Sequence, residues 1–396
     1  MARKQESQSY IPGFDGVRFI AASAVVVHHI EQSKDILGFK SLWLSPVIKS
    51  LGHQGVNLFF VLSGFLITYI LLIEHSELRR ISIKKFYLRR ILRIWPLYYM
   101  IMLIAFVLVP IVAQFSGDYG LVWSKLRLDG LSVNENYIVK FLCYFTLFPN
   151  LAYVLYPGIL FAAQSWSIGV EEQFYLVWPL LFRIFNRYLV HILVLVIFAK
   201  YIFGIIIHQY MVGFDNVFWM DAVSSYYGQF KIEYMATGGL AAYLLSGNQR
   251  SFLVRLLVKP YYQYMVIPAL LLLLCYGVPI KGTQFLTPLA YAWVLLNVAK
   301  SKYGLLNLET PLCSYFGKRS YGIYMLHPIC LYTVHCIFEW TGLLKISIMT
   351  YNVLLYFAVF FVTLSVSSIS YKYYETYFLK LKIKLTPLSA FSSDQK

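Results

Sequence analysis

Arg18 and His29 belong to the first apolar stretch of the chain, Val17 to Ile30, and their types and spacing suit chemistry. A helix turns by about 100° per residue, so their separation of eleven positions puts both side chains on one face, roughly 16 Å apart along the axis. Ionisable groups at membrane depth are costly and usually face a polar interior. A guanidinium binds anions and an imidazole transfers protons near neutral pH, so this face could combine the two. His28 is rotated off the face, and we interpret it as a packing residue.

The composition is that of a membrane protein. Of the 396 residues, 59% are hydrophobic and only 13% are charged, and the mean hydropathy is +0.63. Soluble domains carry about 25% charged residues. We therefore predict an all-α, polytopic membrane helix bundle with about ten transmembrane helices. In this prediction residues 10–380 form one transmembrane domain and residues 381–396 form a short cytoplasmic tail.

Ten apolar runs could supply those helices. They lie near 14–30, 55–73, 95–115, 168–186, 189–208, 230–246, 262–279, 285–299, 320–338 and 349–371. A further apolar stretch, 138–163, contains Pro149 and Gly158, and we interpret it as an external or re-entrant segment. With ten crossings, most Lys and Arg residues lie on one side of the membrane. The positive-inside rule makes this the cytoplasmic side, and both termini lie there too.

The net charge of +16 is explained by these basic loops and requires no nucleic-acid partner. Membrane lipids are the partners that the composition indicates. The five cysteines show no C-x-x-C spacing and mostly lie in apolar runs. We therefore predict neither a metal site nor a disulfide framework.

Five local patterns follow one another along the chain. They are Phe14–Arg18 leading to His29, Gly55–Ile67, Phe86–Tyr98, Gln164–Tyr175 and Ser320–Pro328. Together, in this order, they resemble the acyltransferase family 3 membrane enzymes, which O-acetylate bacterial surface polysaccharides and lipopolysaccharide. The resemblance covers nearly the whole chain, and the order of the patterns makes it specific.

The resemblance implies transfer of an acyl group, usually acetyl, from cytoplasmic acyl-CoA to a sugar hydroxyl outside the bacterial cytoplasmic (inner) membrane. Acetyl-CoA is then a donor substrate, no cofactor is permanently bound, and the acceptor is a cell-surface or lipid-linked glycan. The essential Arg-to-His motif of the family maps onto Arg18 and His29. This chain has Asn57 where the family usually has Asp, and Phe19 where Gly is common. We expect no C-terminal esterase-like domain of the SGNH type.

His29 is the predicted general base or acyl carrier, because acyl transfer to a hydroxyl needs a group that accepts a proton near neutral pH. Glu171 is the predicted carboxylate partner, orienting either His29 or the acceptor hydroxyl. Ser167 precedes Glu171 by one helical turn and supports the same face. Acidic residues also favour helix N-termini, so the alternative is that Glu171 complements a helix dipole.

Four arginines are candidates for binding the phosphates of the donor, because a guanidinium binds phosphate in a forked geometry. They are Arg18, Arg89, Arg90 and Arg93. For Arg18 the alternative is an ion pair with Asp15, three positions earlier. For the other three the alternative is a basic belt that sets the topology and faces lipid headgroups.

Three further residues support the predicted site. Gly64 predicts a close approach of two helices, and Ser63 beside it is a weaker candidate for an acyl-carrying nucleophile, because no base is adjacent in sequence. Pro328 is expected to break its helix. His327 before it either lines the site or is hydrogen-bonded at a kink.

The alternative function is a transporter or flippase for a lipid-linked sugar or a small anion. Several spans with buried charge would suit such a protein. It would move its substrate without CoA, and it gives no reason for the five patterns to occur together.

Overall fold

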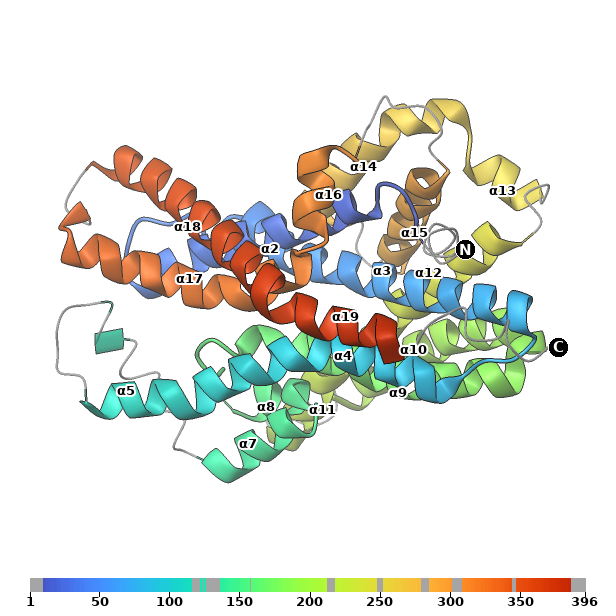
Figure 1. Ribbon diagram of the computed structural model, residues 1–396, viewed down its shortest axis with the longest axis horizontal. Helices are drawn as coiled ribbons and strands as arrows, with labels where there is room; N and C mark the ends of the chain where they lie inside the picture. Colours follow the sequence, from blue (N-terminus) through green and yellow to red (C-terminus); the bar gives the residue numbers. More distant parts are fainter. Residues whose placement is uncertain are drawn as a thin grey trace.

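The computed structural model describes residues 10–115, 122, 124–125, 136–156, 158–211, 218–247, 252–278, 285–300, 308–343 and 347–385. Every regular element among them is a helix (Figure 1), which confirms the predicted all-α class. The first half holds α2 (Phe14–Ile36), α3 (Pro46–Leu78), α4 (Ile83–Leu103), η1 (Ile104–Leu108), α5 (Val109–Phe115), α7 (Tyr137–Phe145), α8 (Pro149–Leu155), η2 (Ala163–Ser165), α9 (Trp166–Phe185) and η3 (Asn186–Tyr188). The second holds α10 (Leu189–Met211), α11 (Phe218–Gln229), α12 (Ile232–Ser246), α13 (Phe252–Leu257), η4 (Pro260–Tyr262), α14 (Gln263–Tyr276), α15 (Leu286–Ala299), α16 (Pro311–Gly317), α17 (Ser320–Trp340), α18 (Ile348–Ser370), η6 (Tyr371–Glu375) and α19 (Thr376–Leu385).

Five helical segments of the described chain are long and apolar enough to cross a membrane. They are Pro46–Leu78, Ile83–Gln114, Ala163–Tyr210, Ser320–Trp340 and Ile348–Leu385. Large apolar side chains such as Phe198, Phe357 and Phe361 are more than half exposed, a surface that suits lipid rather than water. The protein is a multi-pass membrane protein. The count of ten crossings stays a prediction. Within the predicted cytoplasmic tail, residues 386–396 lie outside the described ranges.

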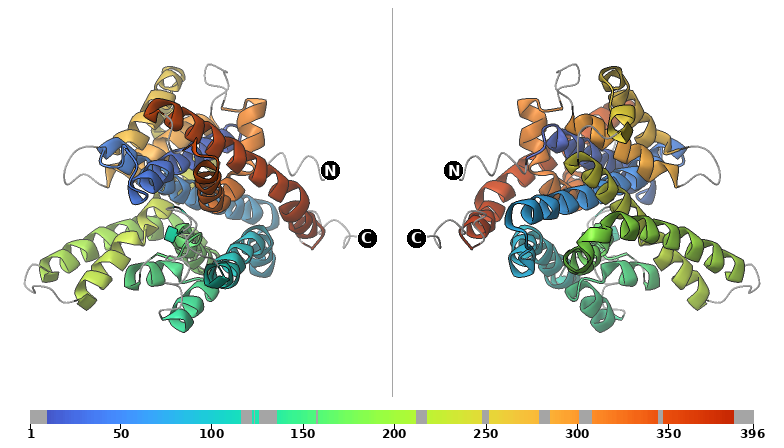
Figure 2. Two further views of the ribbon diagram at one scale, coloured as in Figure 1. Left: turned by 90° about the vertical axis from the view of Figure 1, so that its left-hand side faces the viewer. Right: turned by 90° about the vertical axis from the view of Figure 1, so that its right-hand side faces the viewer.

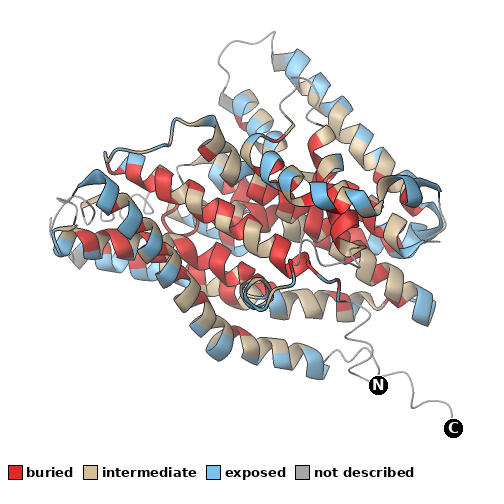
Figure 3. Ribbon diagram, turned by 90° about the horizontal axis from the view of Figure 1, so that it is seen from above, coloured by how far each residue is buried: buried red, intermediate tan, exposed pale blue. Residues whose placement is uncertain are grey.

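The helices pack around a central group (Figure 1). α18 packs on α17 and continues through η6 into α19, which lies along α4. α10 and α11 lie side by side and project from the bundle (Figure 2). Buried residues concentrate in the middle of the molecule (Figure 3).

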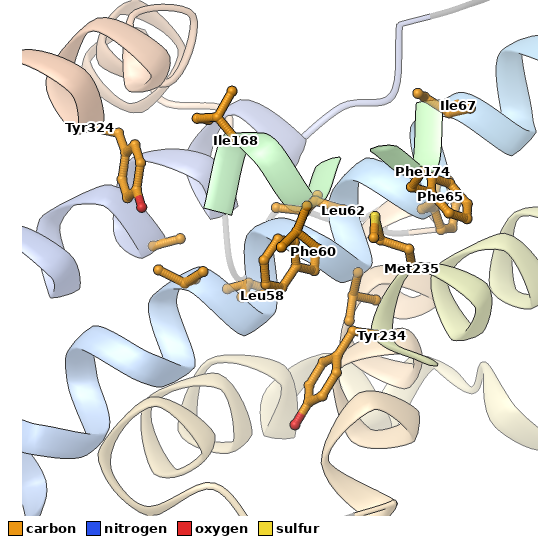
Figure 4. Close-up of a cluster of buried hydrophobic side chains, with 14 of the residues drawn as sticks. Leu58, Phe60, Leu62, Phe65, Ile67, Ile168, Phe174, Tyr234, Met235 and Tyr324 are labelled. Carbon is orange, nitrogen blue, oxygen red and sulfur yellow. The ribbon is translucent and has the colours of Figure 1, made fainter. Parts of the chain in front are cut away.

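The largest apolar core surrounds α3, which packs against α2, α12, α14 and α15. Leu62 and Phe65 of α3 belong to one buried cluster with Phe174 of α9 and Met235 of α12 (Figure 4). At Gly64 the two backbones come so close that a Cβ atom would overlap with the carbonyl oxygen of Met235. The predicted close helix approach at Gly64 is therefore confirmed.

The stretch 138–163 contains two short helices, α7 of nine residues and α8 of seven. Neither approaches the roughly 20 residues that a bilayer crossing needs. After α8 the chain enters the bundle, because Gln164 is buried and its Nε2 donates to the carbonyl oxygen of Met325 at 2.9 Å. A re-entrant path for this stretch stays a prediction.

The helix expected to break at Pro328 is continuous, so the predicted break was wrong, whereas the hydrogen-bonded His327 of the alternative is present. A proline at 328 removes the amide that would bond the carbonyl oxygen of Tyr324. Nδ1 of His327 donates to that oxygen instead, at 2.7 Å. A side chain thus replaces the missing backbone hydrogen bond, and the helix runs through from Ser320 to Trp340.

Replacing Gly64 with Ala should lower the free energy of unfolding by about 1–3 kcal/mol, because the new methyl group forces α3 away from α12. Reversible unfolding of the detergent-solubilised protein would measure this change. Gly228→Ala in α11 is the matched control, since a Cβ there meets no atom within 4 Å. Equal stability of the two variants would contradict the close contact.

Candidate active site

His29 lies on α2 with its ring against His327 of α17. The ring centroids are 4.8 Å apart, and Nδ1 of His29 lies 3.2 Å from Nε2 of His327. Nδ1 of His29 also lies 2.9 Å from the carbonyl oxygen of Val25, one turn earlier. His327 is fully buried, so this contact joins α2 and α17 inside the bundle.

The hydrogen bonds define which ring nitrogen carries the proton. A carbonyl oxygen only accepts, so Nδ1–H of His29 donates to Val25. By the same argument Nδ1–H of His327 donates to Tyr324, and its Nε2 accepts from His29. Nε2 of neutral His29 therefore keeps its lone pair, and no described residue hydrogen-bonds to it. This is the atom that can take up a proton or attack an electrophile.

His28 has the packing role that was predicted. Its Nδ1 lies 2.8 Å from the carbonyl oxygen of Ile48, and its ring centroid lies 4.9 Å from that of Trp43. Gly52 of α3 leaves room for this ring, since a Cβ there would overlap with it. His28 thus fills the contact between α2 and α3.

Tyr324 continues the polar groups from His327 towards α9. Its hydroxyl lies 2.8 Å from Oγ of Ser167 and 2.9 Å from the carbonyl oxygen of Gln164. Ser167 is buried and lies one helical turn before Glu171. The structure therefore links Ser167 to α17 through Tyr324 and places it on α9 one turn before the predicted carboxylate.

Glu171 binds Ser63 and Tyr175 rather than His29. The Ser63 hydroxyl donates to Oε1 at 2.9 Å, and the Tyr175 hydroxyl donates to Oε2 at 2.8 Å. The orientation of His29 comes from His327 and the backbone, while a role of Glu171 at the acceptor hydroxyl stays a prediction. Glu171 lies beyond the first turn of α9, so a helix-dipole contact does not explain it. Ser63 therefore has a carboxylate neighbour, Glu171, which lies 108 positions away in the sequence.

Two of the four predicted donor-binding arginines are already in ion pairs. Nη1 of Arg18 donates to Asp15 at 2.9 Å, so the predicted ion pair is present, and a donor contact beside it stays a prediction. Nη2 of Arg89 donates to Glu74 at 3.0 Å, and Glu74 is buried. The Arg89–Glu74 ion pair connects the first half of α4 with the last turns of α3.

Arg90 and Arg93 are not in ion pairs with the described residues. The Arg90 guanidinium lies over the rings of Phe86 and Tyr175, at 5.7 and 5.4 Å from their centroids. Arg93 is exposed, one turn further along α4, and interacts electrostatically with Arg18. These two guanidinium groups retain their full positive charge for a ligand.

The polar residues of the bundle form two hydrogen-bonded or stacked groups that α9 joins, and we call them together the polar line. Its members are, in order, Arg90, Tyr175, Glu171 with Ser63, then, one turn away on α9, Ser167, followed by Tyr324, His327 and His29. Sequence reasoning missed Tyr175 and Tyr324. Both stand inside the quoted patterns, but the chain holds 34 tyrosines and nothing local distinguishes these two. No three His, Cys, Asp or Glu side chains of the described residues gather closely enough to hold a metal ion.

These features define a multi-pass helical membrane protein with arginines at one end of a polar line and an imidazole at the other. The model of acyltransferase family 3, described as an acyltransferase domain, matches residues 11–372. The chain belongs to this family, as the five patterns predicted.

Several curated proteins are similar to the chain. OatA of Listeria monocytogenes, a peptidoglycan O-acetyltransferase, is 31% identical over 183 residues, covering 46% of this chain and 26% of that protein. A Staphylococcus aureus protein provisionally named as an O-acetyltransferase is 23% identical over 403 residues, covering 96% of this chain and 59% of that protein. YrhL of Bacillus subtilis, provisionally named as a peptidoglycan O-acetyltransferase, is 32% identical over 185 residues, covering 46% and 25%. The chain therefore spans 25–59% of the length of these relatives. No solved structure matches it.

Nitrogen NMR of histidine-labelled protein should show His29 and His327 as the Nδ1-protonated tautomer at neutral pH. The reason is that each Nδ1 faces a carbonyl oxygen, which can only accept. His29→Gln and His327→Gln variants would assign the two signals. An Nε2-protonated His29 would contradict the network, because its lone pair would then face Val25.

Proposed function

We propose that the protein is a membrane O-acetyltransferase that transfers an acetyl group from cytoplasmic acetyl-CoA to a glycan hydroxyl outside the membrane. The polar line carries this proposal, because it connects arginines at one end to the free Nε2 of His29 at the other through an apolar bundle. Phosphates suit the arginine end, and proton transfer suits the histidine end.

The donor is proposed to bind with its phosphates at Arg18, Arg90 and Arg93. Arg18 gives one nitrogen to Asp15 and keeps its other N–H groups for an anion. The ion pair of Arg89 with Glu74 gives that residue a supporting role. The pantetheine arm, which carries amide groups, would follow the hydroxyl and carboxylate groups of the polar line towards His29.

The chemistry at His29 has two routes. As a general base, Nε2 takes the proton of the acceptor hydroxyl while the hydroxyl oxygen attacks the thioester carbonyl, and the thiolate of CoA leaves and receives that proton. As a nucleophile, Nε2 attacks the thioester carbonyl first and the thiolate of CoA leaves. The acceptor hydroxyl then attacks the acetyl-imidazole, which releases Nε2, and the hydroxyl proton passes to the thiolate. In both routes His327 holds the ring with Nε2 free.

A glycan acceptor is supported by two relatives, OatA, which is named as a peptidoglycan O-acetyltransferase, and YrhL, which carries the same name provisionally. A lipid-linked glycan is the second acceptor class. We propose a bacterial cytoplasmic membrane with both termini inside, because the basic residues of the sequence sort to that side. Transport of a lipid-linked sugar would also use a polar path, but it needs no free imidazole nitrogen.

His29→Ala should lower acetyl transfer from acetyl-CoA to a glycan acceptor by about a hundredfold or more, because the variant has no base or acyl carrier at this position. Transfer would be measured with purified protein and radiolabelled acetyl-CoA, and in cells by the O-acetyl signals of surface glycans. His208→Ala on the exposed part of α10 is the matched control and should transfer at the wild-type rate.

Wild-type transfer by the His29→Ala variant would overturn the role of His29. Movement of a labelled lipid-linked sugar across vesicles in the absence of acetyl-CoA, with no acetylation, would favour the transporter instead.

A further inference from the structure

Arg319 lies between α16 and α17 and is held against two tyrosine rings. Its Cζ lies 3.4 Å from the ring centroid of Tyr315 and 4.6 Å from that of Tyr371. Nη1 donates to the carbonyl oxygen of Tyr315 at 2.6 Å. The guanidinium is therefore fixed in place by α16 and by the π-helical turn η6.

The backbone before Arg319 packs against the start of α2. A Cβ at Gly317 would overlap with the carbonyl of Asp15, so the two backbones touch there. Asp15 is the residue that pairs with Arg18. Arg319 thus follows directly on a segment that contacts the arginine end of α2.

Tyr321, two residues after Arg319, connects α17 to α4 beside Arg93. The Tyr321 hydroxyl donates to the carbonyl oxygen of Ile94 at 2.8 Å. Glu375 interacts electrostatically with both Arg93 and Arg319. Arg319 therefore belongs to the arginine end of the polar line, although it is distant from the other arginines in sequence.

The charges at this end leave Arg319 available for an anion. Arg18 and Arg89 already share their charge with Asp15 and Glu74. Arg319 forms no direct salt bridge with a described residue, although the Glu375 carboxylate interacts with it electrostatically, and its Nε is buried without a hydrogen-bond partner. A buried unpaired donor is costly, and a ligand oxygen would satisfy it.

An arginine that only sets the topology would extend its charge to water and headgroups. Arg319 is instead held flat on aromatic rings, with Nη1 used by Tyr315. Nε and Nη2 remain, and they form one edge of the planar group. This edge matches two oxygens of a phosphate.

We propose that Arg319 binds a phosphate in the nucleotide part of acetyl-CoA, with Tyr315 and Tyr371 holding its guanidinium in position. The inference rests on the proposed donor. Acetyl-CoA carries a pyrophosphate and a 3′-phosphate, and Arg90 and Arg93 are the other guanidinium groups here that no carboxylate pairs with. Arg319 adds a third guanidinium without a direct salt bridge to this end, and Glu375 alone offsets only part of the charge of Arg93 and Arg319.

Adenosine 3′,5′-bisphosphate, acetyl-CoA and acetyl-pantetheine separate this role from a structural one. In the full-length purified protein, Arg319→Ala should raise the KM for acetyl-CoA and the inhibition constant of adenosine 3′,5′-bisphosphate by about tenfold or more. Its kcat and its kcat/KM with acetyl-pantetheine, which lacks the nucleotide, should stay at wild-type values. Arg319→Lys should recover only part of the affinity, because an ammonium lacks the planar edge.

Lys318→Ala is the matched control, since Lys318 is the adjacent exposed cation. An Arg319→Ala variant with wild-type constants for both nucleotide compounds would overturn the proposal, as would equal losses with acetyl-CoA and acetyl-pantetheine. If Arg319→Ala does not fold, Arg319→Lys with wild-type nucleotide affinity overturns it. A wild-type protein that transfers acetyl from neither donor would instead overturn the proposed function.

Discussion

The contact between α3 and α12 at Gly64 determines where the interior polar groups of this protein lie. A glycine there lets the backbone of α3 touch the carbonyl of Met235, with no side chain between the two helices. The next residue back, Ser63, is rotated by about 100° and reaches α9, where its hydroxyl meets Glu171. The close contact between α3 and α12 therefore fixes the position along α3 from which the Ser63 hydroxyl reaches the Glu171 carboxylate of α9.

In an apolar bundle every polar group needs a partner within the protein, and this requirement accounts for the state of His29. Pro328 leaves the carbonyl of Tyr324 without its amide, and His327 supplies a donor to it. That bond commits Nδ1 of His327, so its Nε2 can accept from His29. The donation to Val25 leaves Nε2 of His29 free, and the proline on α17 leaves His327 as a second acceptor for the same Nδ1–H.

The sequence predicted what local spacing determines and missed what depends on packing between distant segments. The helical period placed Arg18 and His29 on one face, and Gly64 alone indicated the close helix contact. The His29–His327 contact joins residues 298 positions apart, and nothing local indicates it. The break expected at Pro328 was wrong, because proline rules describe the backbone and not the side chain that replaced its hydrogen bond.

The arginines of this protein show two ways of holding a cation in a low-dielectric setting, and the difference bears on function. Arg18 and Arg89 are held by carboxylates, which offset their charge. Arg90 and Arg319 are held by aromatic rings, whose negative faces stabilise a guanidinium without cancelling its net charge. In the proposed donor site the second kind adds more attraction for phosphate, because the charge of a paired cation such as Arg18 is partly offset by its carboxylate. The aromatic residues that pack beside these arginines therefore preserve positive charge at the end of the bundle where an anionic donor would enter.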